Sequence, residues 1–210
     1  MQKAIRLALG AMMTVASLST AANACTRAAV PGAEATINPA RLDQPLLDAA
    51  IASEVNHQRC RNGLSALSGA PALRAPALDH ARWMAASGTL SHHSTRPGRA
   101  TVKARILSSG LRIRRGSENI ARVALYKVEG RTGYRIVDAA ACAFATPAGQ
   151  PIGRHSYASV ARYTVGLWMN SPDHRVNILG RKYKIAASAV ALDPKGRACG
   201  SLFIAQNFAG

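Results

Sequence analysis

Apolar residues recur at helical spacing along the first part of the chain. After Asp43 they place Leu47, Ile51 and Val55 on one face of a helix, and the pattern ends near Gly63. Aspartate is a favourable residue before a helix, and glycine suits the position just after one. The pattern therefore predicts a first helix from about Asp43 to the turn at Gly63.

Three further stretches have the same spacing and recognisable ends. The predicted helices run from about Pro76 to Gly88, from Thr101 to Ser109, and over residues 156–171, ending before Pro172. Because a proline cannot continue a helix, the sequence "SPDHR" is expected to form a stiff turn that holds His174.

The pattern changes to that of strands in two regions. Residues 122–154 carry β-branched and aromatic residues with Gly and Pro turns, and are expected to form an inserted hairpin. Residues 185–208 predict two antiparallel strands joined by the turn "DPKG". Residues 25–41 have no clear period and are expected to be a leader held only by Cys25. Helices that cover antiparallel strands make an α+β fold.

The first 24 residues have the layout of a secretory signal. Basic residues precede a short apolar run, and Ala22-Asn23-Ala24 predicts cleavage between Ala24 and Cys25. A lipoprotein is disfavoured, because Ala22 stands where a lipidation motif has a large aliphatic residue. No later apolar run approaches the roughly 20 residues of a membrane helix. The mature chain is expected to be a monomer in the periplasm or outside the cell, without a transmembrane segment.

Four cysteines occur in this exported chain, with no Cys-x-x-Cys pair that would suggest zinc or a redox dithiol. An even number of cysteines in an oxidising compartment predicts two disulfide bonds. Three connectivities are possible, and the sequence does not decide among them; the favoured pairs are Cys142 with Cys199 and Cys25 with Cys60.

The chain is strongly basic, with 27 Lys and Arg against 10 Asp and Glu and a formal net charge of +17. No acid lies between Asp79 and Glu118. Such a field favours anionic polymers or membrane surfaces, although a solvated basic surface without a particular partner is the alternative. Aromatic residues make up only 5% of the chain and do not alternate with basic ones, which disfavours nucleic acid as a partner.

Five motifs occur in order between residues 55 and 208, within a resemblance that covers roughly residues 46–208. They are "VNHQRCRNGLSAL" at 55–67, "LDHARWMAASGTLSHHS" at 78–94, "GSENIA" at 116–121, "WMNSPDHRVNIL" at 168–179 and "QNF" at 206–208. Together they resemble the bacterial branch of the CAP superfamily, the SCP-like domains of cysteine-rich secretory proteins, antigen five and pathogenesis-related proteins. The resemblance implies a CAP domain over residues 42–210, an α-β-α sandwich with a small antiparallel sheet between helical layers.

The resemblance also implies a shared cleft formed by His92, Glu118 and His174. His93 is the alternative to His92. Ser117 precedes Glu118 where the family commonly has glycine. The position of the family's second acid falls on Ser171, so a full four-residue site is in question. Asp173 is nearby in sequence, but nothing in the sequence orients it.

Two histidines and a carboxylate can hold Zn²⁺ or another divalent metal, or can transfer protons. The alternative is that Glu118 accepts hydrogen bonds and fixes loops together. The remaining histidines and the tryptophans are expected to be structural, and Gln206 is expected either to line the cleft floor or to be an ordinary strand residue. The structural set is His57, His80, His155, Trp83 and Trp168.

No residue is marked out as a nucleophile, since Ser171 beside Pro172 lacks the strand-turn-helix context that such a serine needs. The sequence therefore favours a non-enzymatic, secreted or periplasmic binding module for an anionic envelope polymer, a lipid or a protein. The alternative is a metal-assisted hydrolase, for example a protease, that uses His92, Glu118 and His174.

Overall fold

The computed structural model describes residues 25–130 and 133–210, so the predicted signal segment lies outside the described residues. The helices are α1 (Gln44–Arg61), α2 (Pro71–Ser87), α3 (Val102–Leu107), α4 (Tyr157–Asn170) and α5 (Pro172–Ile178). The strands are β1 (Ser68–Gly69), β2 (Gly116–Ala124), β3 (Arg135–Asp138), β4 (Ala143–Ala145), β5 (Pro151–Ile152), β6 (Ile185–Asp193) and β7 (Ser201–Ala209).

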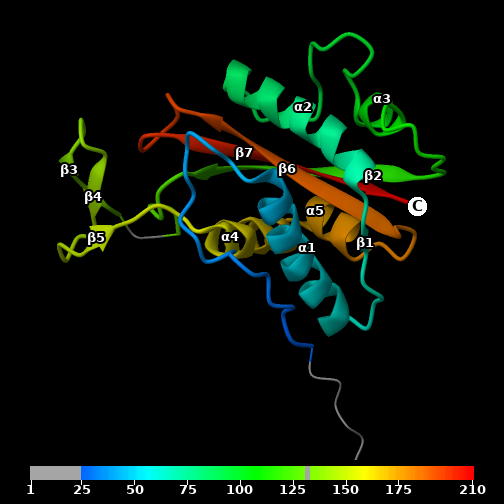
Figure 1. Ribbon diagram of the computed structural model, residues 1–210, viewed down its shortest axis with the longest axis horizontal. Coiled ribbons are helices and arrows are strands. Elements are labelled where there is room, and N and C mark those ends of the chain that lie inside the picture. The colour runs from blue at the N-terminus through cyan, green and yellow to red at the C-terminus, as the bar shows by residue number, and fades with distance from the viewer. Residues whose placement is uncertain (1–24, 131–132) are drawn as a thin grey trace, which may run out of the picture.

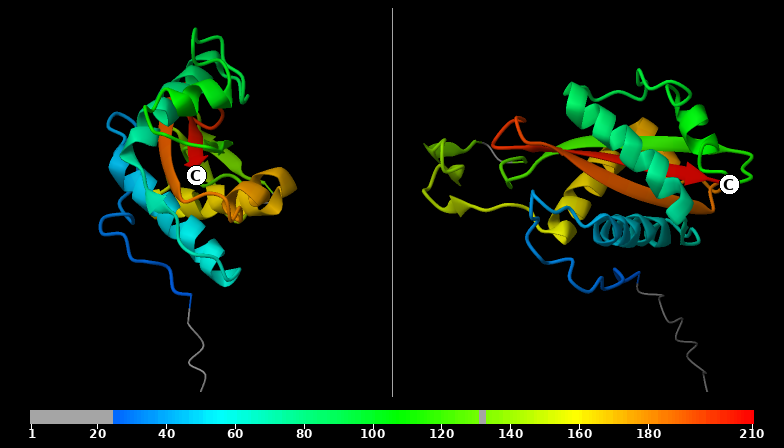
Figure 2. Two further views of the ribbon diagram at one scale, coloured as in Figure 1. Left: turned by 90° about the vertical axis from the view of Figure 1, so that its right-hand side faces the viewer. Right: turned by 45° about the horizontal axis from the view of Figure 1, so that its top comes forward.

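The central sheet has the strand order β1-β6-β7-β2, in which β7 pairs antiparallel with both β6 and β2, and β1 runs parallel to β6. Helices α2 and α3 lie on one face of this sheet, and α1, α4 and α5 lie on the other (Figures 1 and 2). This layered α+β architecture, one sheet between two helical layers, confirms the predicted fold.

Strand β7 is buried along its whole length and packs against helices on both faces. Because successive strand residues point to opposite faces, its side chains divide between two hydrophobic clusters. Phe203 and Ala205 pack in the cluster that includes Ala77 and Ala81 of α2. Leu202, Ile204 and Phe208 pack in the larger cluster on the face of α1, α4 and α5. The sheet therefore has no solvent-facing side at its centre.

The first helix begins as predicted, and the second begins earlier. The side chain of Asp43 accepts a hydrogen bond from the Leu46 N–H at 3.0 Å, so it caps α1. Helix α2 starts at Pro71 rather than Pro76. Like Pro76, Pro71 has a φ angle suited to the first position of a helix, where the backbone N–H has no partner within the helix. Pro76 then lies inside the helix. Helix α3 is capped by Thr101 as predicted but ends at Leu107, two residues before the predicted end.

Within the segment "SPDHR", residues 172–175 are helical rather than part of the predicted turn. Ser171 has extended backbone angles (φ −95°, ψ 119°), which end α4, and Pro172 is the first residue of the separate helix α5. A proline is tolerated there because the first N–H groups of a helix have no partner within it, and the carboxylate of Asp173 suits the first turn. His174 is therefore held by a helix and not by a turn.

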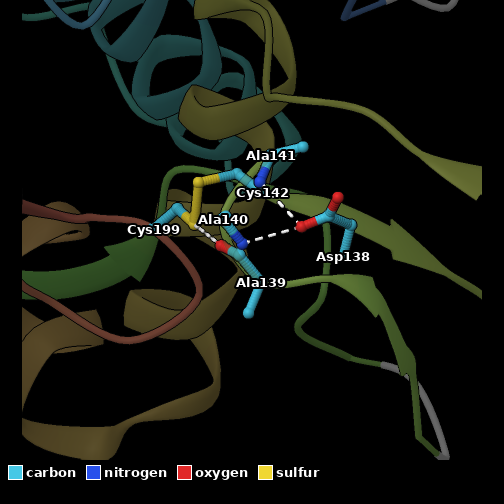
Figure 3. Close-up of a disulfide and its surroundings, with 6 residues drawn as sticks. All are labelled: Asp138, Ala139, Ala140, Ala141, Cys142 and Cys199. Atoms are coloured by element: carbon cyan, nitrogen blue, oxygen red, sulfur yellow. Dashed lines mark hydrogen bonds between the residues drawn. A yellow bond between two sulfur atoms is a disulfide. The ribbon is translucent and has the colours of Figure 1, made fainter.

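The predicted insertion contains a second sheet with the order β3-β4-β5. It lies beyond the end of the central sheet that is farther from the C-terminus (Figure 1). The insertion begins later than predicted, since Arg122, Val123 and Ala124 belong to β2 and pair with β7. The Asp138 side chain accepts hydrogen bonds from the N–H groups of Ala140 and Ala141 at 2.8 and 3.0 Å, next to the disulfide bond (Figure 3).

Two disulfide bonds connect the favoured pairs, Cys25 with Cys60 and Cys142 with Cys199. The first joins the leader to the last turn of α1. The second joins the small sheet to the connection between β6 and β7. Among residues 25–130 and 133–210 no cysteine is free. Within the same residues, no helix has the length and apolar character needed to span a membrane.

The leader is held by more than the disulfide bond. Ala33 and Ile37 are buried in the main hydrophobic cluster, and the Ile37 N–H donates to the His155 carbonyl at 2.9 Å. Thr36 also forms an isolated β-bridge with Ser156, the residue that caps α4. The expectation that Cys25 alone holds the leader was therefore wrong, because its scattered apolar residues pack against the domain.

Candidate functional site

Glu118 lies on β2, the edge strand of the central sheet, and its side chain is fully buried. The carboxylate points toward the α2 and α3 layer, where it meets a guanidinium and an imidazole. Arg105 donates from Nη2 to Oε1 at 2.7 Å and from Nε to Oε2 at 3.1 Å. His92 Nδ1 lies 2.9 Å from Oε1. Both oxygens of the carboxylate are therefore hydrogen-bonded.

Arg105 forms more hydrogen bonds than any other member of this cluster. Its side chain is fully buried, and its remaining N–H groups donate to the carbonyls of His92 at 2.7 Å and of Arg99 and Ala100 at 3.2 Å. All five guanidinium donors are used in this way. Arg105 thus binds the segment that carries His92 to Glu118.

The environment of Glu118 favours its charged form. Burial raises the pKa of the carboxyl, but the hydrogen bonds from His92 and Arg105 and the charges of His80 and Arg105 lower it by more. The pKa therefore stays below its usual value. A buried carboxylate that is paired and hydrogen-bonded in this way is a stable anion at neutral pH.

His80 is a fourth member of the cluster, on α2. Its side chain is fully buried, and Nε2 lies 2.9 Å from the Ser91 carbonyl and 3.6 Å from Glu118 Oε1. Burial lowers the pKa of His80, and the charge of Arg105 lowers it further, against the opposing effect of Glu118. A neutral imidazole can donate from Nε2 to Ser91 and fix the start of the segment that carries His92.

His174 reaches the cluster from the opposite helical layer. Its ring centroid lies 6.3 Å from that of His92, so the two imidazoles approach each other beside the edge of β2. Asn119 donates to the His174 carbonyl at 3.1 Å, and Asn177 donates to Asn119 Oδ1 at 2.9 Å. These amides attach α5 to β2. Burial and the nearby charge of His92 lower the pKa of His174, while Asp173 opposes the shift.

Glu118 is not available as a direct ligand of a metal ion, because both of its oxygens are bound by Arg105. Among the residues that the structure describes, no group of three or more His, Cys, Asp or Glu side chains is placed to hold one. The physical reason lies in Arg105, whose charge sits directly on both oxygens of Glu118 and would repel a divalent cation. His92 Nδ1 is also directed at the carboxylate, so only its Nε2 faces outward.

The structure places the other candidates away from this cluster. His93 is exposed, so His92 is the histidine that contacts Glu118. Ser171 lies between α4 and α5 as a helix boundary. Gln206 is buried on the opposite face of the sheet, where it donates to Ser188 Oγ at 3.1 Å, and does not line the cluster. Ser117 is partly buried, and its hydroxyl has no hydrogen-bond partner within the described chain.

The residues expected to be structural take part in packing. Trp168 is buried and donates from Nε1 to the Ile120 carbonyl at 2.9 Å. Trp83 stacks on His80, and its Nε1 donates to Thr95 Oγ1 at 3.0 Å. His155 Nδ1 lies 2.9 Å from Ser159 Oγ at the start of α4. His57 is half-buried on α1.

The sequence analysis missed Arg105 and placed His80 outside the site. The sequence contains a pattern that could have identified each of them, because both lie on the apolar face of a helix. His80 shares a helix face with Ala77, Ala81 and Met84, all of them buried. Arg105 lies one residue before Ile106 and three after Val102, on the inward side of a short helix. An ionisable residue on an apolar helix face needs a buried partner, and Glu118 is the partner.

Comparison with known proteins identifies the family. Residues 52–208 match the model of the CAP family, described as the cysteine-rich secretory protein family, and the chain belongs to this family. The match confirms the resemblance inferred from the five motifs. No curated protein matches the sequence significantly.

A solved structure supports the same fold. The chain is similar to an extracellular protein containing an SCP domain from Bacillus anthracis str. Ames, with 20% identity and a TM-score of 0.52. The similarity covers 79% of this chain and 41% of that one, so this chain spans less than half of that relative. An outer surface protein from Borrelia burgdorferi is 15% identical, with a TM-score of 0.49 over 76% of this chain and 89% of that one.

Proposed function

We propose that this CAP domain is a non-enzymatic binding module that acts outside the cytoplasm on an anionic component of the cell envelope. The observation that carries the proposal is the state of Glu118. Its two oxygens are occupied by Arg105 and His92 in a buried cluster. A carboxylate held in this way anchors loops, and its pairing with Arg105 and His92 makes it a weak acceptor of a proton from a substrate or water.

Location outside the cytoplasm is supported by two features. The chain contains two disulfide bonds, which persist in oxidising compartments. The Bacillus anthracis protein of similar fold is described as extracellular. Export by the predicted signal of residues 1–24, with cleavage before Cys25, would bring this chain to an oxidising compartment where its disulfide bonds persist.

The basic charge is concentrated between Asp79 and Glu118, where eight Lys and Arg residues occur without an acid. Asp79 lies 3.5 Å from Arg99 and 3.9 Å from Arg96, and Glu118 pairs with Arg105. The other five, Arg82, Lys103, Arg112, Arg114 and Arg115, are exposed, and none forms a salt bridge within the described residues. Three of them, Lys103, Arg114 and Arg115, line one pocket, and cations gathered in this way favour an anionic partner.

The alternative, a metal-assisted hydrolase, has less support. A hydrolase of this kind would use Glu118 as a metal ligand or as a base. Arg105 donates hydrogen bonds to both oxygens of Glu118, which hinders either role. His92 and His174 remain close enough to share a proton or a polar ligand. Activity screening of the wild type against His174→Ala, with and without Zn²⁺, tests this alternative directly.

Binding of the purified mature chain to lipopolysaccharide, peptidoglycan and phosphatidylglycerol vesicles tests the proposal. We expect binding to at least one of them that weakens as salt rises from about 0.05 to 0.5 M, because exposed charges are screened. The triple variant Arg112→Gln, Arg114→Gln, Arg115→Gln should bind more weakly. The triple variant Arg41→Gln, Arg61→Gln, Arg135→Gln removes the same charge from other exposed positions and should bind normally. Absence of salt-sensitive binding to all three materials contradicts the proposal.

A further inference from the structure

A pocket of about 630 Å³ lies between α3 and the start of β2, separate from the buried Arg105 and Glu118 cluster. We call it the α3 pocket. Its walls come from α3, the segment that leads into β2, and the segment before β6. Its volume is within the range of about 300 to 1,000 Å³ that is typical of small-molecule sites.

The floor of the α3 pocket is apolar. Ile106 is fully buried in a cluster with Leu73 and Ala209, and Val102 and Ile113 pack against this cluster while remaining partly exposed. Leu107 is 50% exposed at the pocket. Val102, Leu107 and Ile113 therefore expose apolar surface at the pocket, beside the buried Ile106, and a ligand that covered this surface would remove it from water.

The rim of the α3 pocket is basic. Lys103, Arg114, Arg115 and Lys182 line it together with the apolar residues, and no acidic side chain does. None of the four forms a salt bridge within residues 25–130 and 133–210. Four like charges around one pocket repel each other, and a bound anion would relieve that repulsion.

The backbone holds the rim in place. The N–H groups of Arg114 and Arg115 donate to the Gly210 carbonyl oxygen at 3.0 and 2.9 Å. Gly116 follows, and a Cβ atom there would lie 2.7 Å from Ile106 Cδ1, so glycine allows the close approach of β2 to α3. The two guanidinium groups are therefore carried by a fixed segment, which suits the planar recognition of a phosphate.

We propose that the α3 pocket binds a single-chain lipid with a phosphate headgroup, with the acyl chain on the Val102, Ile106, Leu107 and Ile113 floor and the phosphate on the Lys103, Arg114, Arg115 and Lys182 rim. A simple anion would not use the floor, and a neutral lipid would not use the rim. The inference rests on the proposed function, for which it names a ligand class and a site.

Three probes distinguish the contribution of the acyl chain to binding from that of the phosphate headgroup. 1-Lauroyl lysophosphatidic acid has both the chain and the phosphate, glycerol 3-phosphate has only the headgroup, and 1-lauroylglycerol has only the chain. Isothermal titration of the full mature chain, below the micelle concentration of each probe, should show the first to bind at least about tenfold more tightly than either of the others.

Two variants test the two surfaces. The double variant Arg114→Gln, Arg115→Gln should weaken lysophosphatidate binding about tenfold or more and remove most of its salt dependence. Leu107→Glu places a charge on the floor at a half-exposed position and should weaken binding by a similar factor without a large change in melting temperature. Lys195→Gln with Arg135→Gln, both exposed and outside the pocket lining, is the charge-matched control and should bind normally.

The contrary outcomes are distinct. Equal binding of glycerol 3-phosphate would mean a phosphate site only, and equal binding of 1-lauroylglycerol would mean an apolar pocket only; either overturns the inference. If lysophosphatidate does not bind but anionic polymers or vesicles still do, the pocket assignment fails and the proposed function stands. If nothing anionic binds, both fail.

Discussion

Arg105 and Glu118 form a fully buried ion pair with two direct hydrogen bonds, one to each carboxylate oxygen. The pair joins the short helix α3 to the edge strand β2, and through the other donors of Arg105 it also holds the segment of residues 92–100. Removing either partner leaves an uncompensated buried charge. Because Arg105 also donates to the His92 carbonyl, the pair helps to hold His92 beside Glu118.

The stability of the ion pair is the first test. Arg105→Met should lower the free energy of unfolding by about 3 to 5 kcal/mol, the usual cost of breaking a buried pair. Arg112→Met removes the same type of charge from an exposed position and should change stability by no more than about 0.5 kcal/mol. Urea denaturation of the two variants measures the difference. Equal and small effects would mean that the pair does not support the cluster.

The approach of His92 and His174 predicts a coupled titration. The charge of His92 helps to lower the pKa of His174, and the two rings are 6.3 Å apart. His92→Gln should therefore raise the pKa of His174, as measured by NMR titration of the imidazole protons. His93→Gln changes the exposed neighbour and should leave that pKa in place. An unchanged His174 titration in His92→Gln would show that the imidazoles are independent.

Because His155 is buried, we expect the folded protein to lose stability as the pH falls. Burial and the charge of Lys127 lower the pKa of His155 to about 4, well below its ordinary value near 6.5. The unfolded chain then binds a proton more readily than the folded one, so this contribution to stability is complete above about pH 6.5 and is lost as the pH falls toward 4. Burial also lowers the pKa values of His80 and His174, which add to the same trend.

The variant His155→Gln isolates the contribution of this residue. It should show a shallower loss of stability than the wild type between about pH 6.5 and pH 4, when melting temperatures are compared at each pH. NMR titration of the wild type should find the His155 imidazole neutral down to about pH 4. A His155 that titrates near its ordinary pKa would contradict the buried environment described at the start of α4.

The disulfide bonds predict two separable effects of reduction. Intact-mass measurement should show a gain of four hydrogens on full reduction, and the native protein should not react with thiol reagents. Loss of a native bridge typically costs about 2 to 5 kcal/mol in a small secreted domain. Replacing Cys142 and Cys199 by Ser should raise hydrogen exchange in β3, β4 and β5, whereas replacing Cys25 and Cys60 should raise it in the leader.

The sequence by itself determined the parts of the fold that depend on local pattern. The cap at Asp43 and the two antiparallel strands within residues 185–208 follow from rules that act over a few residues, and the family motifs pointed to His92, Glu118 and His174. The start of α2 was misplaced, because both Pro71 and Pro76 can begin a helix, and the pairing of Ser68–Gly69 with β6 just before Pro71 was not visible in the sequence. The helical state of Pro172–Ile178 was missed because a proline after a helix usually ends helical structure.

Only the tertiary structure decided the chemistry of the candidate site. Arg105 lies 13 residues before Glu118, and no local rule pairs them; the pair forms because α3 packs against the edge strand and brings a buried cation to a buried anion. This pairing places a guanidinium on both oxygens of the carboxylate that the sequence offered as a metal ligand. The α3 pocket likewise joins residues from three segments of the chain, and its combination of an apolar floor and a basic rim exists only once the sheet is assembled.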